Sequence, residues 1–62
     1  MKVGDLVYFR DKYHLVVKEN TYIWSLQEVG SNWPPSIMDK GSVKMYIESG
    51  QFRIISKSLN KQ

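Results

Sequence analysis

The chain combines 62 residues with the absence of cysteine, and this combination restricts its fold more than any other feature. A domain of this length buries only about 60% of the surface that its unfolded chain exposes, so its stability is marginal. Without cysteine, neither disulfides nor thiolate zinc sites can support the fold, and the composition fits a reducing compartment. We therefore predict one small hydrophobic core, supported by association with a partner or with a second copy of the chain.

The composition is that of a folded protein, with 42% hydrophobic and 24% charged residues. No run approaches the ~18 apolar residues of a membrane span. The opening residues MKVGDLVYF do not form a signal-like apolar core, because Gly4 and Asp5 interrupt them. We predict a soluble cytoplasmic protein without membrane contact, with one domain over residues 1–56 and a polar basic tail over residues 57–62.

The net charge of +3 suggests nucleic-acid binding, but its location weakens that interpretation. Basic and acidic groups balance over residues 1–52. The whole excess comes from Arg53, Lys57 and Lys61, in the last predicted strand and the tail. A long-range attraction for polyanions is therefore weak and screened at physiological salt.

Three runs in the first half of the chain alternate in the way that predicts strands. Residues 6–9 place Val7 and Phe9 on one face. Residues 13–18 group Tyr13, Leu15 and Val17 opposite His14, Val16 and Lys18, and residues 22–27 group Tyr22, Trp24 and Leu26. Turns at residues 11–12 and 19–20 are predicted to join these runs into a meander, in which an asparagine at position 20 suits a tight turn.

The segment EVGSNWPPSIMDKGS (28–42) has a different character, because two adjacent prolines exclude a central strand. We predict a surface connection with a single helical turn over residues 36–40, ended by Gly41. Trp33, just before the prolines, is predicted to form a lid over the open end of the core rather than an exposed ligand platform.

The segment VKMYIESGQFRII (43–55) is predicted to be a hairpin turning at Ser49-Gly50. This register sets Tyr46 opposite Arg53, with Lys44 and Ile55 on the same face. The opposite, apolar face completes a predicted core consisting of Val7, Phe9, Leu15, Val17, Trp24, Leu26, Val43, Met45, Ile47, Phe52 and Ile54.

Five short strands with tight turns predict an all-β fold, a small antiparallel barrel or a strongly bent five-stranded sheet with at most one short helical turn. Several apolar residues remain outside the predicted core. They suggest a second surface for self-association or a protein partner, and they are Leu6, Tyr8, Val16, Ile23 and Ile55.

Several segments together resemble short proteins, many of them encoded by bacteriophages, that look like minimal SH3-like barrels. The segments are KVGDLVYF (2–9), LVV (15–17), YIWS (22–25), WPPS (33–36) and FRIIS (52–56). About fifteen residues, 37–51, stand between WPPS and the last strand, where these proteins have very few. The resemblance implies an SH3-like fold, a phage origin and a place in the host cytoplasm or the virion. It implies no specific function, because SH3-like folds have many roles.

Catalysis and metal binding are not predicted, and no cofactor is expected. The single histidine, His14, lies on the polar face of its predicted strand without a neighbouring nucleophile, and is interpreted as an ordinary surface side chain. The carboxylates are scattered singly, and the four glycines form no phosphate-binding run.

Two functions remain, and we prefer protein interaction. The chain is then a non-enzymatic module, expected to form homo-oligomers or bind another protein through Leu6, Tyr8, Val16, Ile23, Ile55 and Trp33. The alternative is nucleic-acid binding through Lys44, Tyr46, Arg53 and Lys57, which combine an aromatic ring with cations. A plainer interpretation of this second set is a solvated face stabilised by the Tyr46–Arg53 pair. A proline-rich peptide ligand built on WPPS is weaker still, since a rigid turn explains the two prolines.

Overall fold

The computed structural model describes residues 1–56, which form five strands and one helix. In chain order these are β1 (Leu6–Phe9), β2 (Lys12–Glu19), β3 (Ile23–Glu28), β4 (Ser36–Asp39), α1 (Lys40–Glu48) and β5 (Phe52–Ser56). Within the described part of the chain, no helix is long and apolar enough to cross a membrane.

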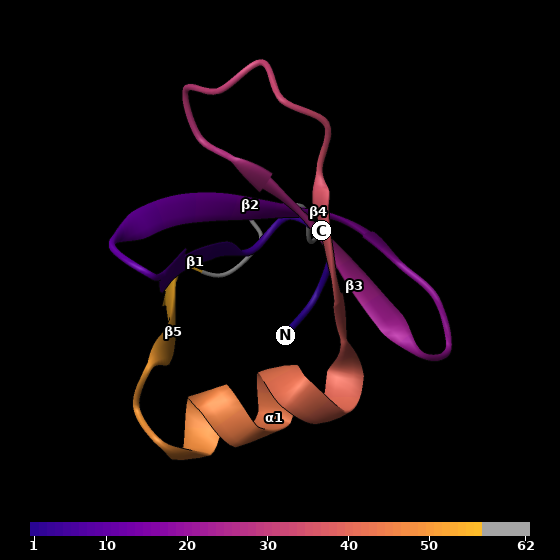
Figure 1. Cartoon of the computed structure of the whole chain (residues 1–62), viewed down its shortest axis with the longest axis vertical. Helices are drawn as coiled ribbons and strands as arrows, with labels where there is room; N and C mark the ends of the chain where they lie inside the picture. Colours follow the sequence, from indigo (N-terminus) through magenta and orange to yellow (C-terminus); the bar gives the residue numbers. More distant parts are fainter. Residues whose placement is uncertain (57–62) are drawn as a thin grey trace.

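The strands form one antiparallel sheet in the order β4-β3-β2-β1-β5, so the last strand returns to pair with the first. Register shifts at residues 6–7 and 16–18 bend it, as β-bulges do. α1 runs from the end of β4 to β5 along one side of the curved sheet (Figure 1). The prediction of a strongly bent five-stranded sheet is confirmed. The sheet is not a closed barrel, because β4 and β5 are its two edges.

The turn between β1 and β2 corrects the predicted orientation of β2. Arg10 and Asp11 both have left-handed backbones, with φ of 54° and 64°, as a two-residue type I′ turn requires. This turn lies one residue earlier than predicted, and it pairs Phe9 with Lys12 and Val7 with His14. Directly paired residues lie on the same face of a sheet, so His14 shares the face of the core residue Val7. Val16, two residues further along, lies on the same core side, whereas Leu15 does not.

Residues 36–48 contradict two further predictions. Ser36–Asp39 is a strand paired with β3 rather than a helical turn, and residues 40–48 form a helix rather than the first strand of a hairpin. Asp39 caps this helix, because its carboxylate accepts a hydrogen bond of 2.9 Å from the backbone N–H of Ser42. Val43, Tyr46 and Ile47 follow a helical spacing that places them on neighbouring positions.

Ser49-Gly50 ends α1 instead of turning a hairpin. The backbone N–H of Gly50 donates to the carbonyl of Ile47 (3.1 Å), and that of Gln51 donates to the carbonyl of Tyr46 (2.9 Å). These two bonds define a Schellman motif, in which the residue after the C-cap is left-handed. Gly50 has φ of 83°, a conformation that glycine adopts without strain.

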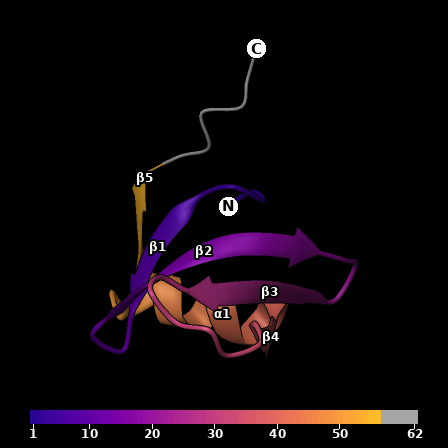
Figure 2. The same ribbon diagram turned by 90° about the horizontal axis from the view of Figure 1, so that it is seen from above.

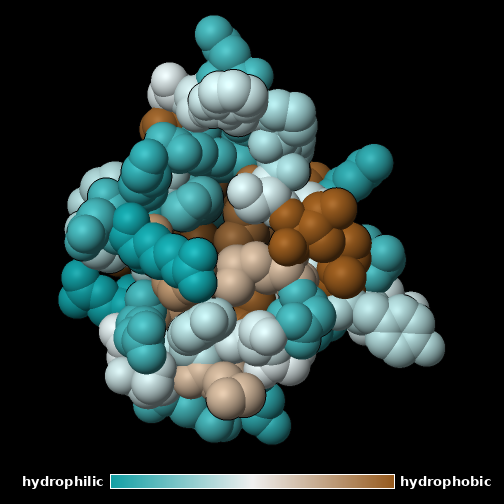
Figure 3. Space-filling model, viewed as in Figure 1, coloured by the Kyte–Doolittle hydropathy of each residue, from teal (hydrophilic) through white to brown (hydrophobic). Residues whose placement is uncertain are grey.

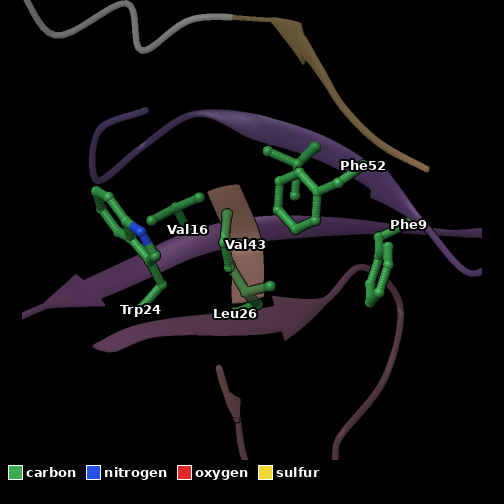
Figure 4. Close-up of a cluster of buried hydrophobic side chains, with 7 residues drawn as sticks. Phe9, Val16, Trp24, Leu26, Val43 and Phe52 are labelled. Atoms are coloured by element: carbon green, nitrogen blue, oxygen red, sulfur yellow. The ribbon is translucent and has the colours of Figure 1, made fainter. Parts of the chain in front are cut away.

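The core lies between the sheet and α1. Its buried apolar members are Val7, Phe9, Val16, Trp24, Leu26, Val43 and Phe52. Figure 4 shows Val43, from α1, among side chains contributed by the strands. Six of the predicted core residues are thus confirmed, and Ile54 is partly buried against them. The prediction is wrong for Leu15, Met45 and Ile47, since each of these side chains is exposed, and Val17 is only half-buried.

Candidate interaction surface

The side of the sheet that faces away from α1 carries a cluster of apolar and aromatic side chains. In Figure 2, the strands are seen from above with α1 beneath them. Alternation along β1 places Leu6 and Tyr8 opposite the core residues Val7 and Phe9, and the register sets Leu6 beside Leu15. We call this surface the outer face and define it by Leu6, Tyr8, Tyr13, Leu15, Arg53 and Ile55. Ile55 has no partner in β1 and is placed here by alternation with Ile54, which packs against the core.

Two tyrosines and one arginine lie side by side on the outer face. The rings of Tyr8 and Tyr13, which pair across β1 and β2, have centroids 4.9 Å apart and planes tilted by 59°. On the other side of β1, the guanidinium carbon of Arg53 lies 5.8 Å from the centroid of Tyr8. The hydroxyl of Tyr8 donates to the carboxylate of Asp11 at 3.4 Å. Tyr8 is therefore held from three sides.

Several members of the outer face remain accessible to solvent. Tyr13 is 50% exposed, Leu15 40% and Ile55 47%. Beside them, Leu6, Tyr13 and Val29 line a shallow hollow of ≈ 370 Å³ together with the ion pair of Lys12 and Glu28. On the side of the molecule shown in Figure 3, hydrophobic residues gather beside hydrophilic ones. Contiguous exposed apolar surface on a small domain is typical of binding sites.

The structure brings together only part of the predicted protein interface. Leu6, Tyr8 and Ile55 lie on the outer face. Val16 does not, because it is 1% exposed and belongs to the core. Ile23 is half-buried and pairs with β4, at the other edge of the sheet.

Trp33 lies outside the outer face, on the loop between β3 and β4, and is 78% exposed. The prediction of a lid over the core is therefore wrong. The side-chain amide of Gln27 donates to the carbonyls of Ser31 (3.3 Å) and Trp33 (2.8 Å), which holds this loop against β3. The indole itself is left in solvent.

Sequence reasoning missed Tyr13 and Leu15, the two outer-face residues of β2. Both were assigned to the core side because β2 was given the wrong orientation. The alternation itself was correct. The signal that could have found them is the length of the turn, because a two-residue turn pairs Val7 and Phe9 with even-numbered residues of β2 and leaves Tyr13 and Leu15 on the other face.

The predicted nucleic-acid residues do not share one surface. Tyr46 lies on α1, where its ring packs 4.9 Å from that of the core residue Phe9, and Lys44 is exposed on the same helix. Arg53 faces Tyr8 on the outer face instead. The predicted cross-strand pair of Tyr46 and Arg53 therefore does not form, because Arg53 pairs with Tyr8. Lys57 lies outside the described residues.

His14 is not the surface side chain that the sequence suggested, since it is half-buried on the core side of β2. Burial lowers its pKa from the ordinary 6.5, and the nearby carboxylate of Glu28 opposes this effect. Its Nδ1 is buried and has no hydrogen-bond partner within residues 1–56.

The carboxylates form no metal site within the described range. Across residues 1–56, no three side chains of the His, Asp and Glu type converge. Asp39 has a lowered pKa because it accepts hydrogen bonds from Ser42, which is the effect expected of a helix cap.

No protein-family model, curated protein or solved structure matches the chain. The resemblance to phage-encoded SH3-like proteins therefore stays a prediction. Function has to be argued from the surfaces of the molecule.

Proposed function

We propose that this protein is a non-enzymatic interaction module that binds protein through its outer face, and that its partner there is a second copy of the chain. One observation carries the proposal. Tyr13, Leu15 and Ile55 remain 40–50% exposed within one cluster, although they occupy a regular sheet. A chain of 62 residues gains stability if association buries such a surface.

The charge distribution favours a second copy over a charged partner. Arg53 is the single charged residue among the six that define the outer face, and residues 1–52 are electrically balanced. An apolar surface without a marked charge is self-complementary in a two-fold contact. Because Arg53 lies on the edge strand β5, a contact centred on β1 and β2 keeps the two guanidinium groups apart. Two sheets then stack about 10 Å apart.

Sedimentation at increasing protein concentration tests the proposal. The contact involves one face of a small sheet, so we expect association in the micromolar range or weaker. Leu15→Lys, which places two like charges near the two-fold axis, is expected to give a monomer at every concentration. Met45→Lys is the matched control, because Met45 is 69% exposed on α1 and belongs to no outer-face contact. A wild-type protein that stays monomeric, or equal behaviour of the two variants, would contradict the proposal.

Nucleic-acid binding is the second candidate, and a different set of residues now favours it. Tyr8, Tyr13 and Arg53 place two rings and a cation together on a β surface, the arrangement that stacks single-stranded bases. Anisotropy of a labelled single-stranded oligonucleotide tests this candidate at low and physiological salt. We expect Tyr13→Ala to remove binding if stacking is responsible, and Lys44→Gln to leave it unchanged. A flat titration of the wild type at low salt would reject this function.

A further inference from the structure

A second site lies apart from the outer face, where the β1–β2 turn approaches β4 and the start of α1. It is a cleft of ≈ 480 Å³, within the range of small-molecule sites. The apolar part of its lining consists of Phe9, Leu26, Ile37, Met38 and the ring of Tyr46, and the basic part of Arg10 and Lys12, with His14 beside them.

Arg10 is the cation best placed to receive a ligand. Its guanidinium carbon lies 4.9 Å from the centroid of Phe9, so the charge rests beside the apolar lining. Within residues 1–56, Arg10 forms no salt bridge. Lys12 differs, because its Nζ is 3.4 Å from the carboxylate of Glu28 and is partly neutralised.

The acidic residue of the cleft is already engaged. Both oxygens of Asp39 accept hydrogen bonds from Ser42, one from the backbone N–H at 2.9 Å and one from the hydroxyl at 2.7 Å. These bonds stabilise the start of α1. One cation beside an apolar wall, with a carboxylate and a partly neutralised lysine nearby, suits a single negative charge better than a dianion.

We propose that this cleft binds an apolar carboxylate, with an aromatic or aliphatic body against Ile37 and Met38 and the carboxylate on Arg10. The ligand is either a free organic acid or the C-terminal residue of a peptide. The proposal is independent of the outer face, since neither Tyr13 nor Leu15 lines the cleft.

Titration with N-acetylphenylalanine and with its uncharged amide, followed by ¹H–¹⁵N correlation spectra, tests the proposal. We expect saturable shifts at the cleft residues, with a dissociation constant on the order of a millimolar. The amide is expected to bind at least about tenfold more weakly, since it cannot form the charge-assisted contact. In a third titration, 3-phenylpropionate binding as tightly as N-acetylphenylalanine would identify a free acid. Weaker binding of 3-phenylpropionate would identify a peptide C-terminus.

Two variants locate the contact. Arg10→Asn removes the guanidinium but keeps a residue that tolerates the left-handed turn, and it is expected to weaken binding about tenfold. Lys18→Gln is the matched control, because it removes a positive charge from an exposed position of β2 outside the cleft. Equal binding of acid and amide, no effect of Arg10→Asn, or no saturable shift in the millimolar range would overturn the proposal.

Discussion

Alanine substitutions at Val43 and Met45 provide the sharpest test of the helix in the second half of the chain. A hairpin over residues 43–55 would bury both side chains on one apolar face. The helix separates them, since Val43 is 2% exposed and Met45 69%. We expect Val43→Ala to destabilise the protein strongly and Met45→Ala to have almost no effect.

The magnitude follows from the burial. Val43→Ala removes two methyl groups at about 0.8 kcal/mol each, and the cavity left behind raises the cost to roughly 2–3 kcal/mol. The higher helix propensity of alanine returns no more than about 0.5 kcal/mol. Met45→Ala removes an exposed side chain and gains slightly in propensity, so its change stays within about 0.5 kcal/mol. A domain of this size has a total stability of roughly 3–9 kcal/mol.

Urea unfolding followed by tryptophan fluorescence measures both changes, because Trp24 is 8% exposed and reports on the core. Val43→Ala is expected to lower the midpoint at an unchanged m-value. If Met45→Ala destabilises the protein as much as Val43→Ala, the side chain of Met45 is buried and the helix is misplaced. A fall in the m-value instead would indicate a change in the unfolded or native ensemble and not a loss of packing.

Three other perturbations test separate contacts. Lys40→Met removes both the 2.6 Å ion pair with Glu19 and the ammonium that lies 4.8 Å from the centroid of the Trp24 ring. Because the ion pair is partly solvent-exposed, urea unfolding should show a salt-sensitive loss of stability of about 1 kcal/mol. In Gly50→Ala the new Cβ would have no atom within 4 Å, but the alanine would be held at φ of 83°. Thermal unfolding should therefore show a loss of stability of about 1 kcal/mol, and an unchanged stability would rule out the left-handed helix cap. Burial lowers the pKa of His14 in the folded state, so on acidification the unfolded state binds the proton first. The free energy of unfolding should therefore fall as the pH drops below about 6.5. In His14→Gln the free energy of unfolding should depend less on pH below that value.

The sequence predicted most of the sheet, because the evidence for strands is local. Period-two alternation located β1, β2 and β3, and the apolar residues around Phe52 located β5. The buried face of a strand cannot be predicted from the strand's own residues alone, because it depends on how the strand pairs with its neighbours. In β2 it depends on the two-residue turn at Arg10-Asp11, which pairs Val7 with His14 and so places Val16 rather than Leu15 in the core.

The helix was missed because its sequence fits two periods. Val43, Met45 and Ile47 alternate as in a strand, whereas Val43, Tyr46 and Ile47 have helical spacing. Topology decides between them. A two-residue hairpin would set β5 beside the preceding strand, but β5 pairs with β1 at the far edge of the sheet, so the chain has to cross from one edge to the other. Asp39, three residues before Ser42, was the local signal of the helix start.

A single turn determines both candidate sites. At Arg10-Asp11 the left-handed backbone sets β2 so that Tyr13 and Leu15 point away from the core, which creates the outer face. The same turn presents the guanidinium of Arg10 over Phe9, which supplies the cation of the cleft. If the turn were one residue longer, Val7 would pair with Leu15, so Leu15 would enter the core and the outer face would lose its apolar centre. The two surfaces therefore depend on one register, although they lie apart and are proposed to bind different partners.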